Sequence, residues 1–201
     1  MAGALLEEHL YLHLADKTQY YYLGQCASTG THSNGVWDNN AIHFKQLKLA
    51  LKSVRLSKQH VAQTCQLLAA ILHLDNIEFT INRGCNVDAT VICNMDVLGI
   101  IAEFLGVQSS TLESMLSYKM KLLKKELCTV FLDPDGASDN HDDLSKTLYS
   151  LLFTWLNEYI NQHLYHDNFD TFIGLFDLPG PHNVMNQPNS LDQFCINFIN
   201  E

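Results

Sequence analysis

A mainly helical fold with a minor β component is predicted by the hydrophobic periodicity of this 201-residue sequence. Apolar residues recur at the spacing of one helix face over most of the chain, and they alternate as in a strand over only a few short stretches. Hydrophobic residues make up 47% of the chain and charged residues 17%, so the chain can bury a core. No segment approaches the roughly 18 apolar residues that a membrane-spanning helix requires.

Helices dominate the first third of the chain. A helical period over residues 4–14 places several leucines on one side of a first helix. Residues 24–39 are rich in Gly, Ser, Thr and Asn and predict a loop. Asn39 or Asn40 is the expected cap of a second helix, and Ser57 is the expected start of a third. The buried stripe expected in the third helix consists of Val61, Leu68, Ile71 and Leu72.

The middle of the chain mixes strands and helices. Residues 77–81 alternate as a half-buried strand does, and residues 87–92 are its expected partner. Asn94 opens a helix that Gly106 closes, and a short helix covers residues 109–116. Residues 118–132 then predict two strands around a lysine-rich turn.

The last third returns to helices, with one apolar strand between them. Residues 134–136, Pro-Asp-Gly, predict a turn, and a long helix is expected over about 139–164. The apolar run 172–176 suits a strand that is buried on both faces. A final amphipathic helix, capped by Asn189 or Ser190, is still running at Glu201, which indicates a chain truncated at this end.

Composition excludes several classes of function. The formal net charge of −10 argues against broad binding to nucleic acids or anionic membranes, which needs a basic face. The N-terminus lacks the basic segment of a signal peptide. The six cysteines contain no C-x-x-C pair, so we expect reduced, mostly small core residues in an intracellular chain, without a zinc site.

Two patterns of possible metal ligands have simpler interpretations. His9 and His13 are spaced i, i+4, but no third ligand is visible, so a surface or hydrogen-bonded histidine pair is favoured over a metal clasp. The acids of residues 133–143 resemble a calcium loop, yet the glycine lies at the wrong position and the closing glutamate is missing. A turn followed by a helix with early acidic residues explains them better. We therefore predict no metal site.

A cluster of lysines lies in the predicted hairpin. Lys119, Lys121, Lys124 and Lys125 are four of only 12 basic residues, and they fall within seven positions of an acidic chain. They could form a docking patch for an acidic partner surface. Alternatively, they belong to a solvated hairpin in which lysines discourage pairing at the strand edge.

A second candidate site follows the predicted buried strand. Asp177, Leu178, Pro179 and Gly180 come where α/β sheets place ligand-binding loops. An aspartate there can orient metal-bound water, and a glycine amide can approach a phosphate; a strand-ending turn explains the residues equally well. The 201 residues contain no G-x-x-x-x-G-K-[ST] loop and no G-x-S-x-G elbow. We therefore expect the chain itself not to be catalytic.

Four segments, in order, resemble the myosin motor domain. Residues 62–79 resemble its "ILAAILHLGNIEF" stretch, and 144–156 its "LAKALYSRLFDWL" helix. Residues 172–181, FIGLFDLPGP, resemble the strand and switch II loop, and 189–201 the start of the relay helix. The resemblance implies that residues 1–201 are a partial α/β motor domain of the P-loop type, from the upper 50-kDa region through switch II. The phosphate-binding loop and switch I would then lie upstream.

Within that family, three segments look like the myosin-like domain of fungal chitin synthases: residues 15–20, 133–137 and 177–180. This resemblance implies a parent in which the domain is joined to a membrane-embedded UDP-GlcNAc glycosyltransferase. It also implies a place on the cytoplasmic side, with the parent at the plasma membrane or on secretory vesicles at sites of polarised growth.

The switch II segment departs from the family pattern. It normally ends Gly-Phe-Glu, and the glutamate forms a salt bridge with a switch I arginine; here Gly180 is followed by Pro181 and His182. Histidine cannot supply that anion, and proline removes a backbone donor. We therefore expect no ATP or Mg to be bound by this chain alone. Asp177 and Gly180 could still support a weak nucleotide contact in the parent.

The resemblance leads to one preferred function and two alternatives. The lysine hairpin corresponds by position to a surface loop that myosins use against actin. We therefore prefer a degenerate motor domain that tethers or positions a cell-wall synthase along actin. The alternatives are a fragment of an active, ATP-dependent myosin motor and a stand-alone helical interaction protein. The expected partners are actin and the remainder of the motor-like domain, with no nucleic acid and no insertion of this segment into a membrane.

Overall fold

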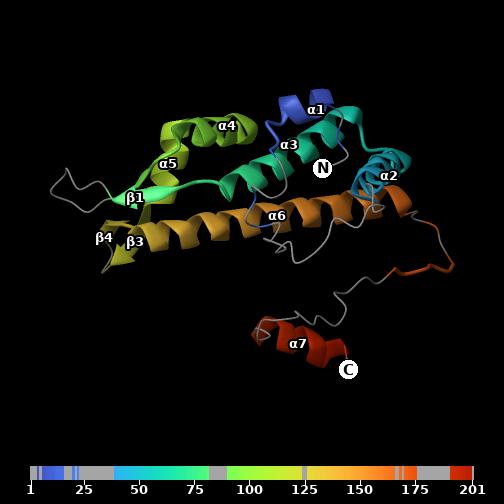
Figure 1. Ribbon diagram of the computed structural model, residues 1–201. Helices are drawn as coiled ribbons and strands as arrows, with labels where there is room; N and C mark the ends of the chain where they lie inside the picture. Colours follow the sequence, from blue (N-terminus) through green and yellow to red (C-terminus); the bar gives the residue numbers. More distant parts are fainter. Residues whose placement is uncertain are drawn as a thin grey trace, which may run out of the picture. The chain divides into compact units, whose positions relative to one another are not determined.

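The computed structural model describes residues 4, 6–15, 20, 22, 39–81, 90–123, 126–165, 168, 170–175 and 191–200. These residues form seven helices and four short strands (Figure 1), so the prediction of a mainly helical fold with a minor β component is confirmed. The chain divides into two compact units, Met1–Tyr165 and His166–Glu201. The loop predicted over residues 24–39 lies outside the described residues except at its last position.

The three helices predicted in the first third of the chain are formed, although the first is shorter than the predicted residues 4–14. Helix α1 covers Leu6–Tyr11 and α2 covers Asn39–Ser53. Helix α3 covers Lys58–Leu74, and the side chain of Ser57 caps it by accepting a hydrogen bond from the His60 amide at 3.1 Å. This bond satisfies one of the amide groups that a helix start leaves unpaired.

The buried side chains of these helices differ from the predicted stripes. Leu6 and Leu10 of α1 are 77% and 69% exposed, whereas Leu12, just after the helix, is 3% exposed. In α3 only one residue of the predicted stripe, Ile71, is fully buried. The buried face of α3 consists of Thr64, Ala69, Ala70, Ile71, His73 and Leu74. The helical period is as predicted, but the buried face is centred on different residues because small and polar side chains, such as Ala70 and His73, also face the core.

The predicted strand pair and the two helices after it are confirmed. Strands β1, Phe79–Ile81, and β2, Thr90–Ile92, pair antiparallel, with Thr80 opposite Val91. Helix α4 covers Met95–Leu105 and ends at Gly106, whose φ of 67° favours glycine. Helix α5 covers Ser109–Ser117.

Helix α6, Pro134–Leu164, begins five residues earlier than predicted. The predicted turn at 134–136 is instead the first turn of this helix. The Asp133 side chain accepts a hydrogen bond from the Gly136 amide at 2.9 Å, and Pro134 occupies a first-turn position. Proline is tolerated there because its missing N–H would have no partner within the helix.

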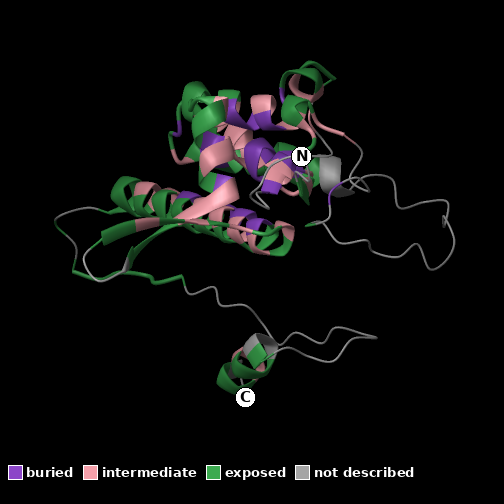
Figure 2. Cartoon of the chain, turned by 90° about the vertical axis from the view of Figure 1, so that its left-hand side faces the viewer, coloured by how far each residue is buried: buried purple, intermediate pink, exposed green. Residues whose placement is uncertain are grey.

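One core holds the first unit together. Its buried members come from α3, β2, α4, α5 and the turns beside them. Figure 2 shows buried residues, in purple, where these elements meet. They are Ala70, Leu74, Ile77, Ile92, Leu98, Ile101, Ala102, Leu112 and Leu116. Leu144 and Leu148 of α6 pack against this cluster. The N-terminal half of α6 therefore contacts the core.

The second unit contains helix α7, Leu191–Asn200, as predicted. The strand predicted over residues 172–176 is not formed in the described part of that segment, because residues 171–175 have no regular structure. Phe172 and Ile173 are 81% and 91% exposed. A strand needs neighbours that satisfy its backbone N–H and C=O groups, and the described residues of this unit offer only a helix.

No single helix in the described ranges is long and apolar enough to cross a membrane; α4 and α5 reach the required length only as a pair bent by 110°.

None of the four cysteines with a described side chain is fully buried, and Cys93 and Cys195 are exposed. The expectation that the cysteines are mostly core residues is therefore wrong for these four.

Candidate functional site

The lysine-rich segment forms the predicted hairpin. Strand β3, Tyr118–Leu123, pairs antiparallel with β4, Glu126–Phe131, and the register places Lys119 opposite Val130 and Lys121 opposite Cys128. Lys124 and Lys125 lie outside the described residues. Two of the four predicted docking lysines are therefore placed, both on one strand.

The register divides the hairpin into two chemically different faces. Directly opposed residues share a face and alternate residues point to opposite faces. One face carries Lys119, Lys121, Cys128 and Val130, and all but Lys121 of these are half-buried. The other face carries Tyr118, Met120, Leu122, Leu127, Thr129 and Phe131. The prediction of a simple lysine patch therefore described only half of the hairpin.

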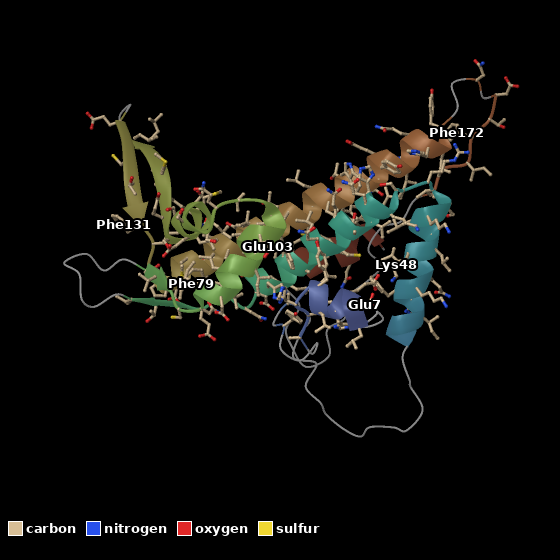
Figure 3. All side chains as sticks on the ribbon, turned by 90° about the horizontal axis from the view of Figure 1, so that it is seen from above. Glu7, Lys48, Phe79, Glu103, Phe131 and Phe172 are labelled. Atoms are coloured by element: carbon tan, nitrogen blue, oxygen red, sulfur yellow. The ribbon has the colours of Figure 1, made fainter. Side chains whose placement is uncertain are left out.

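The second face is apolar and faces solvent. Met120, Leu122, Leu127 and Phe131 are 60%, 72%, 63% and 52% exposed; Phe131 is labelled at the base of the hairpin in Figure 3. We call these four residues the apolar hairpin face. Contiguous exposed apolar side chains are typical of interaction surfaces. The signal was present in the sequence as the alternation Lys-Met-Lys-Leu.

The base of the hairpin is fixed to the core. The Leu132 amide donates to the Ser117 carbonyl at 3.0 Å, and the Thr90 hydroxyl donates to the Leu132 carbonyl at 2.5 Å. The rings of Tyr118 and Phe131 meet edge to face, with centroids 6.2 Å apart. These contacts join both ends of the hairpin to β2 and α5.

A polar cluster on α6 has a structural explanation. The Tyr22 hydroxyl donates to Asp142 Oδ1 at 2.5 Å, and the Tyr22 amide donates to Asp75 Oδ2 at 2.6 Å. Burial, together with the Asp142 carboxylate, raises the pKa of the Tyr22 phenol well above its ordinary value. The phenol therefore stays protonated at neutral pH and joins the N-terminal segment to α3 and α6; it is not an activated nucleophile.

The remaining predicted sites are placed only in part. Asp177, Leu178, Pro179 and Gly180 lie outside the described residues. His9 lies in the last turn of α1, whereas His13 lies after the helix with φ of 50°, so the two do not share a helix face. Within the described ranges, no three His, Cys, Asp or Glu side chains are grouped to hold a metal ion. The hairpin is thus the best-defined candidate site.

Comparison with known proteins identifies the class of domain. All 201 residues match the family described as myosin head (motor domain). The chain belongs to the myosin head family.

Similar proteins include several fungal chitin synthases. The chain is 51% identical to chitin synthase 8 of Mycosarcoma maydis over 201 residues, and 44% identical to chitin synthase 5 of Cryptococcus neoformans var. grubii over 204 residues. It is 35% identical to chitin synthase 6 of Verticillium dahliae over 221 residues. Each of these matches covers the whole of this chain. The chain spans only 10–12% of the length of these relatives. It therefore resembles the myosin-like domain of fungal chitin synthases.

Proposed function

We propose that this chain is part of a degenerate myosin motor-like domain that positions a cell-wall glycosyltransferase along actin. The myosin head family supports the first half of this proposal, and the chitin synthases among the relatives support the second. The parent would then be a chitin synthase that works at a membrane, and this domain would supply attachment to the cytoskeleton.

The apolar hairpin face is the observation that carries the proposal. It offers four exposed apolar side chains on a strand pair whose base is fixed to the core, and Lys119 and Lys121 lie on the reverse face. Apolar contacts supply most of the free energy of association, and charges around them steer an acidic partner into place. Actin is acidic, so it fits both features of the hairpin.

Attachment without motor activity is favoured over the alternative of an active motor. The Gly180-Pro181-His182 ending of switch II lacks the anionic residue that closes the family's nucleotide site. A domain that binds actin but does not hydrolyse ATP would hold the attached enzyme in place and would not move along the filament. ATP and Mg therefore have no role in the function that we propose for this chain.

Actin co-sedimentation with the whole chain tests the proposal. Leu122 and Leu127 are a cross-strand pair on the apolar hairpin face, and replacing both with serine should lower the pelleted fraction several-fold at any salt concentration. Lys119→Glu with Lys121→Glu should lower it mainly at low salt, because salt screens surface charges. The matched control is Leu6→Ser with Leu10→Ser, a pair of similar exposure on α1. Unchanged pelleting by the Leu122/Leu127 variant, with unchanged circular dichroism, would contradict the proposal.

A further inference from the structure

Helix α2 and the turn after it form a local reversal of charge that is separate from the hairpin. Residues 39–58 contain Lys45, Lys48, Lys52, Arg55 and Lys58 and no Asp or Glu. Five of the chain's 12 basic residues therefore lie in 20 positions, with a formal charge of +5 in a chain of −10. The net charge, which argues against a basic face, conceals this segment.

One of these cations is used inside the fold. Lys48 Nζ lies 3.0 Å from the Glu8 carboxylate, and it also lies 4.7 Å from the centroid of the Phe44 ring. Figure 3 shows Lys48 on the side of α2 that faces α1. Phe44 and Leu51, seven residues apart, are buried on this inner side. The inner side of α2 thus packs against the rest of the unit.

A stripe of exposed residues runs beside this inner side of α2. Ile42, Lys45, Leu49 and Lys52 follow the spacing 3, 4, 3, which brings them onto one helix face. Ile42 and Leu49 are 53% and 58% exposed, and both lysines are exposed. We call these four residues the α2 stripe. Cationic and aliphatic side chains therefore alternate along its length.

The end of the stripe is fixed by contact with α6. Arg55 adopts a φ of 63° in the turn after α2, and its carbonyl accepts a hydrogen bond from the Tyr159 hydroxyl at 3.1 Å. This bond holds the turn in place while the side chains of Arg55 and Lys58 remain exposed. Two further cations therefore extend the positive surface beyond the helix.

We propose that the α2 stripe is a peripheral docking surface for an anionic phospholipid membrane. The lysines suit the headgroup phosphates, and the two aliphatic side chains suit the boundary between headgroups and acyl chains. A protein partner is less well matched, because protein interfaces are enriched in aromatic residues and depleted in lysine, whereas the stripe contains only lysine and aliphatic residues. The contact lies on the membrane surface and needs no spanning segment.

Vesicle sedimentation with the whole chain tests this inference. The chain should pellet with vesicles of phosphatidylcholine and phosphatidylserine but not with vesicles of phosphatidylcholine alone. Each cation removed near an anionic surface should lower binding about fivefold, so Lys45→Gln with Lys52→Gln should lower it roughly 25-fold. Ile42→Ser with Leu49→Ser should also weaken binding, and that loss should persist at high salt.

Matched variants separate the α2 stripe from other surfaces. Lys119→Gln with Lys121→Gln removes the same charge from the hairpin, and Leu6→Ser with Leu10→Ser removes an exposed apolar pair from α1; both should leave vesicle binding unchanged. Because all of these side chains except Lys119 are exposed, circular dichroism should show folded variants. The inference is overturned if the original chain ignores phosphatidylserine vesicles, or if the hairpin variant loses as much binding as the stripe variant. It is also overturned if the stripe variant loses only actin binding, which would indicate a protein partner.

Discussion

The packed helices α3, α4 and α5 and the run at residues 172–175 are both apolar in sequence, yet only the helices are buried. Leu98 and Ile101 of α4 are fully buried, whereas Ile173 is 91% exposed. The difference lies in the neighbours that each segment has. Helix α4 packs on both α3 and α5, whereas the described residues of the unit that contains the run form no strand. Apolar sequence therefore gives a tendency to be buried, and partner elements decide whether burial occurs.

The largest expected effect on stability comes from a substitution in the buried helices. Leu98→Ala should lower the free energy of unfolding by about 2–5 kcal/mol, because it removes buried methyl groups and leaves a cavity. Urea denaturation followed by circular dichroism measures the change. Met115→Ala on the neighbouring α5, where the side chain is 57% exposed, is the control and should change the free energy of unfolding little. A similar small loss for Leu98→Ala would mean that the core is loosely packed.

Most of the fold could be predicted from the sequence because its signals are local. Ser57 and Gly106 mark helix ends by chemistry that operates within one turn, and both are confirmed. Two predictions differ from the structure, for different reasons. Pro134 is compatible both with a turn and with the first turn of a helix, so its local signal is ambiguous. The run at 172–175 depends on neighbours that its own residues cannot specify.

The candidate site could be predicted only in outline. The hairpin and the positions of its lysines followed from the sequence, but the sorting of Lys119 and Met120 onto opposite faces required the strand register. The net charge of −10 conceals the α2 stripe, because acidic residues elsewhere outweigh the positive charge of residues 39–58. The absence of acidic residues over 39–58 was visible in the sequence; the exposure of Ile42 and Leu49 was not.

A smaller effect on stability is expected from the side chains that cap the starts of α3 and α6. Ser57→Ala should cost about 1 kcal/mol, because the His60 amide loses the hydroxyl that accepts its hydrogen bond. Asp133→Ala should cost a similar amount at the start of α6, where the Gly136 amide is capped. Thermal unfolding of both variants measures the losses. Ser57→Asp is the control, because it keeps an acceptor at the cap and should retain stability; a loss equal to that of Ser57→Ala would contradict the capping explanation.

A further effect is confined to acidic pH and concerns His73 on the buried face of α3. Its Nε2–H donates to the Leu12 carbonyl at 3.0 Å, and its side chain lies among Tyr20, Phe104 and nearby His13. Burial lowers the pKa of His73 below its ordinary value of 6.5, although the bond to Leu12 opposes this shift. The unfolded chain therefore binds a proton more readily than the folded chain. The contribution of neutral His73 to the free energy of unfolding is therefore fully present above pH 6.5. It is lost as the pH falls below that value.

Urea denaturation at a series of pH values measures this dependence. His73→Gln keeps an N–H donor for Leu12 but cannot titrate, so its stability should fall less between neutral and acidic pH than that of the original chain. His141→Gln is the control for the loss of a buried imidazole, because His141 on α6 is buried to a similar extent. An unchanged pH dependence in the His73 variant would show that another group is responsible.

The smallest expected effect on stability tests the exposed side of the comparison. Ile173→Ser should change the free energy of unfolding by less than about 0.5 kcal/mol, because the side chain is 91% exposed and has little buried area to lose. The same change should reduce self-association, since it interrupts an exposed apolar run that includes Phe172 and Leu175. Denaturation and light scattering on one sample measure the two quantities, and Asn168→Ser, at an exposed position outside the apolar run, is the control. A loss of stability as large as that of Leu98→Ala would mean that the run is buried in solution, and the contrast between the two regions would disappear.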